Sequence, residues 1–179
     1  MQTNETISQS ICSVILRELL KALVQIHGTG IFHGNLNDEY VIVSEGAHVK
    51  LKGFLFYALN PKPSRRLGNA LFHAPDYLKG RSADFADDVW SLGILAIKMA
   101  TGKTPHENFQ GNYSAFARRV VLGASPSLSI EFSTNFQDFV ASCLIKNPDL
   151  RPSCAQLLMH PFIEEYSLLP ASQINDILK

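Results

Sequence analysis

The side chains that could support acid–base or metal chemistry gather in one short segment, FHGNLNDEYVIV, at residues 32–43. In this segment Asp38 and Glu39 are carboxylates, which can accept a proton or bind a metal ion through oxygen. Asn35 is a neutral amide and has no proton-accepting role near neutral pH. Asp38 and Glu39 are therefore the carboxylates of this segment that could stand in for a catalytic one.

The segment that follows is basic and has no carboxylate. Between Gly46 and Pro75 the sequence contains neither Asp nor Glu. Its charged side chains are all cations: Lys50, Lys52, Lys62, Arg65 and Arg66. Because Mg²⁺ prefers oxygen ligands, this segment predicts no magnesium site in any register. Arg65 and Arg66 indicate either a solvated basic loop or a site for an anion or an acidic partner.

Composition excludes several classes of protein. The chain has 179 residues, 46% of them hydrophobic, which is enough for one globular core. Lys and Arg balance Asp and Glu at 16 each, so no net charge favours nucleic acid or an anionic membrane. The three cysteines form no CxxC pair, and no apolar stretch reaches the roughly 20 residues of a membrane span. Without a signal-peptide pattern at the N-terminus, the expected location is cytoplasmic.

The elements that would position these residues are mostly helical. Apolar spacing predicts an amphipathic helix over residues 6–27, with Thr6 and Gln9 as a capping box. Short strands are expected at 31–33, 40–44 and 48–52, the last two paired as a hairpin. Residues 86–100 are apolar nearly all round, which is typical of a central helix. Further helices are expected at 113–122, 134–145 and 153–159, so the fold class is mainly α with a small β-hairpin.

Five segments, in order, resemble the protein-kinase family. FHGNLNDEYVIV is similar to the catalytic loop, HVKLKGF to the segment that ends in Asp-Phe-Gly, and HAPDYL to the Ala-Pro-Glu element. DDVWSLGILAIKMATGKTPH and NPDLRPSCAQLLMHPFI resemble the family's central helix and last helical subdomain. The closing segments look most like the sterile-twenty-like serine/threonine kinases and their adaptor pseudokinases.

The resemblance implies the C-terminal (large) lobe of the kinase fold over residues 1–165, with 166–179 as a tail that is a short helix or flexible. It also implies that the N-lobe, with its Gly-rich loop, is absent from this sequence. Because ATP lies between the two lobes in this family, we expect no cofactor, neither ATP nor Mg²⁺, for this chain alone.

The family's catalytic positions carry other residues here. Asn35 matches the Asp that accepts or orients the hydroxyl proton, and Asn37 matches the Lys that neutralises the transferring phosphate. Tyr40 and Gly53 match the Asn and the Asp that hold the metal. These positions predict a pseudokinase that is not an enzyme.

Scaffold positions, by contrast, match the family. His33 and Phe54 match two members of a stacked hydrophobic spine, and Asp88 matches a buried acceptor for the catalytic-loop backbone. Asp76 and Arg151 match an ion pair that ties the activation segment to the last helices. The apolar column beneath the adenine is matched by three residues, Ile42, Leu95 and Met99.

We therefore expect a protein-binding, scaffold or regulatory module in kinase signalling. Its partner would be a protein, such as a kinase or a separate N-lobe, or a second copy of the chain, and neither nucleic acid nor a membrane. The candidate partner surface consists of Phe54, Leu55, Phe56, Tyr57, Arg65 and Arg66. The alternative is a divergent ATP-dependent serine/threonine protein kinase, or a fragment of one, that needs an N-lobe from elsewhere.

Overall fold

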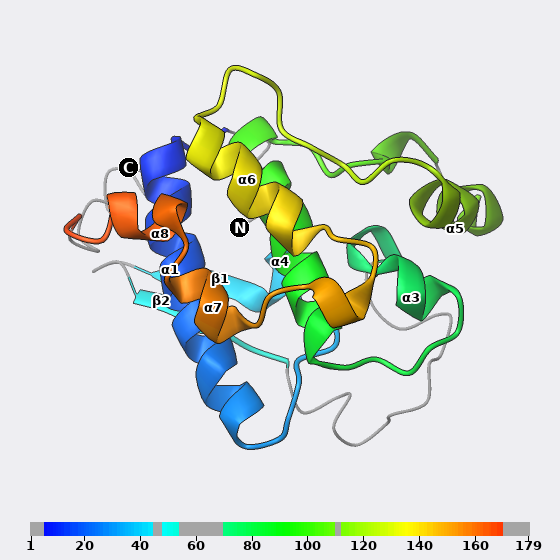
Figure 1. Cartoon of the computed structure of the whole chain (residues 1–179), viewed down its shortest axis with the longest axis horizontal. Coiled ribbons are helices and arrows are strands. Elements are labelled where there is room, and N and C mark those ends of the chain that lie inside the picture. The colour runs from blue at the N-terminus through cyan, green and yellow to red at the C-terminus, as the bar shows by residue number, and fades with distance from the viewer. Residues whose placement is uncertain (1–5, 45–47, 54–69, 110–111, 170–179) are drawn as a thin grey trace.

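The computed structural model describes residues 6–44, 48–53, 70–109 and 112–169. Helices dominate these residues, and two strands form one antiparallel sheet, as the sequence predicts (Figure 1). The helices are α1 (Gln9–Gly28), α3 (Pro75–Leu78), α4 (Phe85–Thr101), α5 (Tyr113–Leu122), α6 (Thr134–Cys143), α7 (Cys154–Leu158) and α8 (Pro161–Glu165). The strands are β1 (Val41–Ser44) and β2 (His48–Leu51). Single 3₁₀ turns are η1 (Asp38–Tyr40), η2 (Ala70–Phe72), η3 (Glu107–Phe109) and η4 (Pro148–Leu150).

Helix α4 lies at the centre of the core, as its apolar sequence predicts. It contacts α1, α6, η2 and η4, and most of its side chains are buried on every side. Asp84 and Asp87 form a capping box at its start, which satisfies backbone N–H groups that the first turn leaves without partners. Gly102 ends the helix with a φ of 72°, a left-handed conformation that favours glycine. The burial of α4 makes it a rigid support for the loops around it.

Helix α1 packs beside α4 but begins later than the sequence predicts. The expected capping box of Thr6 and Gln9 is wrong, because Gln9 is the first residue of the helix. Its side-chain oxygen instead accepts a hydrogen bond from Ser133 N at 3.1 Å. Upstream of the helix, Ile7 N donates to Met99 O at 2.9 Å, which ties the segment before α1 to the end of α4. A tertiary contact has replaced the local cap.

The hairpin pairs Val41 with Leu51 and Ser44 with His48. The strand expected at residues 31–33 is wrong, since that segment lies in no strand. The reason is that His33 N donates to the carboxylate of Asp88 and is not available for a sheet ladder. Short apolar runs do not distinguish a strand from a buried loop.

The C-terminal helices close over α1. Ser13 donates its hydroxyl to Phe162 O at 3.1 Å, across the contact between α1 and α8. Arg17 donates to the backbone carbonyls of Tyr166 and Ser167, at 3.1 and 2.8 Å. The first residues of the predicted tail therefore lie against α1, whereas residues 170–179 are outside the described part. Among the described helices, none is both long enough and apolar enough to span a bilayer.

Candidate functional site

The carboxylate of Asp88, on α4, binds the backbone of the segment that resembles a catalytic loop. The Asp88 side chain is fully buried, and its two oxygens accept hydrogen bonds from His33 N and Gly34 N, each at 2.7 Å. His27 Nε2, at the end of α1, lies 2.8 Å from the same carboxylate. One buried carboxylate thus fixes the loop to two helices, in the position that the sequence predicts for Asp88.

The buried imidazole of His33 orders the start of this loop. Its Nε2 donates to Lys52 O at 2.8 Å, and its Nδ1 accepts from Asn35 N at 3.2 Å. With Nδ1 as the acceptor, Nε2 is the ring nitrogen that donates. Gly34 follows with a φ of 73°, a left-handed backbone that favours glycine. His33 joins the loop to the residue that follows β2, consistent with the packing role predicted for it.

Asn35 and Asn37 face each other across the loop. The Asn37 amide nitrogen donates to Asn35 O at 3.0 Å and lies 3.3 Å from Asn35 Oδ1. Asn37 Oδ1 accepts from Glu39 N at 2.9 Å and caps η1. Asn37 is buried, with 1% of its surface exposed. Its side chain stabilises the turn, whereas Asn35 is only half-buried and stays within reach of a bound molecule.

The carboxylate of Asp38 forms an ion pair that the sequence did not predict. Lys98 of α4 approaches Asp38 Oδ2 at 2.7 Å, and Asp38 is 6% exposed. The other oxygen, Oδ1, has no hydrogen-bond partner among the described residues. Glu39, in contrast, is exposed. The signal for this pair was Lys98 itself, a single cation in the otherwise apolar run of α4.

Tyr40 occupies the space that a side chain at position 53 would need. Gly53 has a φ of 89°, and a Cβ placed on it would lie 2.5 Å from Cδ1 of Tyr40. No side chain fits at position 53 unless the ring of Tyr40 moves. Over the described residues, no group of three or more His, Cys, Asp or Glu could hold a metal. The residues here therefore do not fit a magnesium ion at the family's ligand positions.

The remaining predicted site residues are separated. Leu95 and Met99 are residues of α4 that are buried in the hydrophobic core, with 2% and 5% of their surface exposed. Ile42 on the hairpin, in contrast, is 41% exposed. The candidate partner residues Phe54, Leu55, Phe56, Tyr57, Arg65 and Arg66 lie outside the described residues, and so does the spine role of Phe54.

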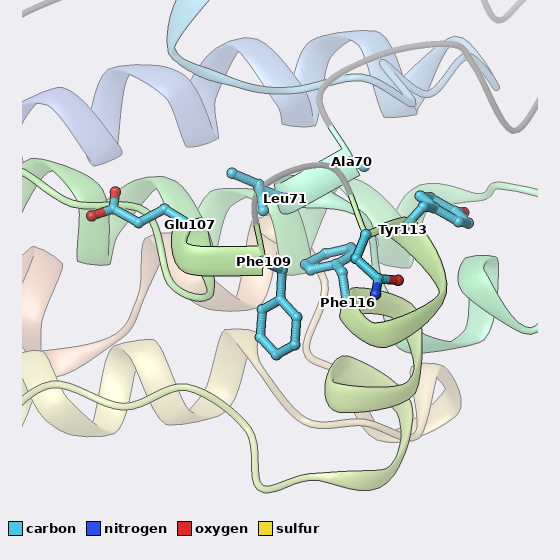
Figure 2. Close-up of a pocket in the computed structure, with 7 residues that line it drawn as sticks. Ala70, Leu71, Glu107, Phe109, Tyr113 and Phe116 are labelled. Atoms are coloured by element: carbon cyan, nitrogen blue, oxygen red, sulfur yellow. The ribbon is translucent and has the colours of Figure 1, made fainter.

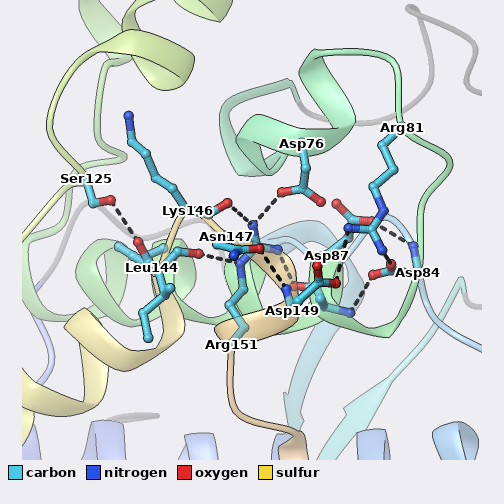
Figure 3. Close-up of polar contacts among 12 residues, drawn as sticks. Asp76, Arg81, Asp84, Asp87, Ser125, Leu144, Lys146, Asn147, Asp149 and Arg151 are labelled. Carbon is cyan, nitrogen blue, oxygen red and sulfur yellow. Dashed lines mark hydrogen bonds and ion pairs between the residues drawn. The ribbon is translucent and has the colours of Figure 1, made fainter.

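Asp76 and Arg151 meet in a buried site (Figure 3). Arg151 follows η4, has a fully buried side chain and donates to a carboxylate oxygen of Asp76 on α3. Its remaining donors bind Ile145 O at 2.6 Å and Ala86 O at 2.9 Å. The guanidinium also lies 5.3 Å from the ring centre of Trp90. Arg151 joins α3, α4 and the segment after α6.

A second carboxylate, Asp87, lies beside this pair. Its Oδ2 accepts from Asp84 N at 2.7 Å, and its Oδ1 has no hydrogen-bond partner among the described residues. Burial raises the pKa of Asp87 from 3.8 to about 7, partly opposed by the hydrogen bond from Asp84 N. The nearby carboxylates of Asp76 and Asp84 raise this pKa further, whereas Arg151 lowers it.

This arrangement predicts an unusual dependence of stability on pH. Because the pKa of Asp87 is higher in the folded state, the folded protein binds more protons between pH 4 and pH 7. The free energy of unfolding should therefore fall as pH rises through this range, with Asp87 contributing at most about 1.4 kcal/mol per pH unit. Urea unfolding of wild type and Asp87→Asn from pH 5 to pH 8 measures this contribution as a difference. Equal pH profiles in the two proteins would contradict it.

A cavity of about 360 Å³ lies between η2, η3 and α5 (Figure 2). Aromatic and aliphatic side chains form much of its wall, and Glu107 supplies a carboxylate. The lining residues are Ala70, Leu71, Glu107, Phe109, Asn112, Tyr113 and Phe116. In size and character this cavity fits one or two apolar side chains of a bound protein or peptide.

Comparison with known proteins identifies the scaffold. Residues 1–163 match the protein kinase domain family. The chain belongs to the protein kinase family. This family and the described elements together confirm the predicted C-lobe fold of the kinase superfamily.

Several curated relatives are named as serine/threonine-protein kinases. The kinase sid1 of Schizosaccharomyces pombe is 34% identical over 177 residues, which cover 96% of this chain and 36% of that protein. The kinase shk1/pak1 of the same organism is 32% identical, covering 99% of this chain and 27% of that protein. Serine/threonine-protein kinase 10-A of Xenopus laevis is 34% identical over 86% of this chain and 17% of its own length. These relatives support the predicted sterile-twenty-like group, and the chain spans about a third of their length or less.

The comparisons contradict one prediction. Substitutions at four positions, Asn35, Asn37, Tyr40 and Gly53, led to the expectation that this protein is not an enzyme. The relatives are named as serine/threonine-protein kinases, which points to an enzyme. The prediction was wrong because it inferred function from individual side chains, whereas the whole domain resembles proteins named as kinases.

Proposed function

We propose that this chain acts as the large lobe of a serine/threonine protein kinase, where it binds the protein substrate and presents the hydroxyl group that receives phosphate from ATP. Its family and the names of its relatives support this function. The observation that carries the proposal is the buried carboxylate of Asp88, which holds the loop of residues 33–40 in a defined conformation. Phosphoryl transfer depends mainly on such positioning.

Asn35 is the residue of this loop that can contact the substrate hydroxyl. Its half-buried amide can hydrogen-bond to the hydroxyl and orient it, but it cannot accept the proton. A positioned general base usually contributes about 10²–10⁴-fold to rate, so we expect transfer to be slow.

ATP and its metal would be held mainly outside the residues described. The position of Tyr40 against Gly53 leaves no room for a metal-binding side chain there. We therefore propose that this chain alone binds neither ATP nor Mg²⁺. An N-lobe, whether in the same polypeptide or a separate one, would supply the nucleotide site.

A phosphorylation assay tests this function. The chain, fused to the N-lobe of a relative such as sid1, is incubated with labelled ATP, Mg²⁺ and a mixture of Ser/Thr peptides. We expect phosphate incorporation above that of the N-lobe alone and about a tenfold loss in Asn35→Ala, because the hydroxyl loses its orienting partner. Lys103→Ala, an exposed change after α4, is the matched control and should retain the rate.

Two outcomes would overturn the proposal. One is that the fused protein incorporates no more phosphate than the N-lobe alone. The other is that Asn35→Ala retains the full rate, since transfer would then not use this loop.

A further inference from the structure

Three cations from three different elements converge near the C-terminal end of α5. Lys79 directly follows α3, Arg119 lies on α5, and Lys146 follows α6. Helices α3 and α5 contact each other (Figure 1). We call Lys79, Arg119 and Lys146 the α5 basic cluster.

Backbone contacts fix two members of the cluster around Gly123. Lys146 Nζ donates to the carbonyls of Val121, at 2.9 Å, and of Gly123. The Arg119 guanidinium packs on the same glycine so closely that a Cβ at Gly123 would lie 2.8 Å from Nη1. The absence of a side chain at position 123 therefore leaves room for Arg119 beside the glycine whose carbonyl binds Lys146.

The cations of this cluster are not held in ion pairs within the described residues. Burial lowers the pKa of Lys146, and the nearby charges of Lys79 and Arg119 lower it further. Within the part of the chain that the structure describes, none of the three forms an ion pair with a carboxylate. Residues 77–83, 108–130 and 139–148 contain no Asp or Glu, and the flanking carboxylate of Asp149 lies 3.8 Å from Arg81.

We propose that the α5 basic cluster binds an acidic segment of a partner protein. The cluster adjoins the cavity along one helix, because Phe116 lines the cavity and Arg119 lies three residues further on the same side of α5. A segment with an apolar side chain followed by Asp or Glu residues would fill both sites. Net neutrality of the chain disfavours nucleic acid as the occupant, because a polyanion is attracted by extended positive charge.

This proposal does not depend on phosphoryl transfer, so binding alone tests it. The probe is a fluorescein-labelled peptide with one Leu followed by alternating Glu and Gly, and its counterpart has Gln in place of Glu. Fluorescence anisotropy at low salt measures the Kd for the full chain. We expect the Glu peptide to bind at least about tenfold more tightly than the Gln peptide and to weaken as salt is raised.

Charge reversal locates the site. Lys79→Glu combined with Arg119→Glu should weaken binding of the Glu peptide by about tenfold or more. The matched control, Lys21→Glu with Lys50→Glu, makes the same change in net charge on α1 and β2, which lie across the molecule from α5 (Figure 1). The control should change the Kd by less than about twofold, and circular dichroism confirms that both variants are folded. Equal weakening in the two variants, or equal binding of the two peptides, would overturn the proposal.

Discussion

Replacing Arg151 by alanine should lower the free energy of unfolding by about 3–5 kcal/mol. The change would leave Asp76 as a buried carboxylate without its cation. It would also remove the donors to Ile145 O, after α6, and to Ala86 O, in the first turn of α4. Urea-induced unfolding followed by circular dichroism measures the loss.

The control for this prediction is an exposed ion pair of the same type. Arg81 lies 2.9 Å from Asp84, with side chains 45% and 33% exposed. Arg81→Ala should therefore cost less than about 1 kcal/mol, because water solvates both partners. A similarly small loss for Arg151→Ala would mean that the tie between α3 and the last helices does not stabilise the fold.

Replacing Asp88 by alanine should also cost about 3–5 kcal/mol, and in addition it should release the loop of residues 33–40. The variant leaves His33 N and Gly34 N buried without acceptors, and His27 loses its partner. Each buried polar group left unsatisfied costs about 1–3 kcal/mol. In Asp88→Ala the rate of amide hydrogen exchange should increase more at His33 and Gly34 than at the backbone of α4.

Two further variants make this second prediction specific. Asp88→Asn retains one acceptor oxygen and should recover part of the lost stability. Asp138→Ala removes a carboxylate that is 69% exposed and lies 3.2 Å from His160, so it should leave the loop's exchange unchanged. Unchanged exchange at His33 and Gly34 in Asp88→Ala would show that something other than Asp88 holds the loop.

The amino-acid sequence by itself determined the helical architecture and the central place of α4. A run that is apolar on every side has no stable position except inside the core, so its burial follows from composition. The pairing of the two strands followed from the apolar run at residues 41–43 and the alternation of apolar and polar residues at 48–51. These features depend on side-chain patterns over a few turns or a few residue pairs.

Local sequence patterns gave a wrong prediction in two places, because a residue distant in the sequence forms the hydrogen bond there. Gln9 could have capped α1, but its side chain binds Ser133 N instead. The run at residues 31–33 has strand-like residues, yet Asp88 takes the N–H of His33. In both cases the deciding contact joins residues more than 50 positions apart, and no local spacing encodes it.

Only the tertiary structure decided what surrounds the candidate site. Lys98 pairs with Asp38 because α4 passes beneath the loop, and Tyr40 fills the space beside Gly53 because the loop returns toward β2. The α5 basic cluster exists for the same reason, since Lys79, Arg119 and Lys146 come from three separate segments. Side-chain charge and volume are properties of the sequence, but whether they compensate, exclude or repel one another depends on distances that the fold sets.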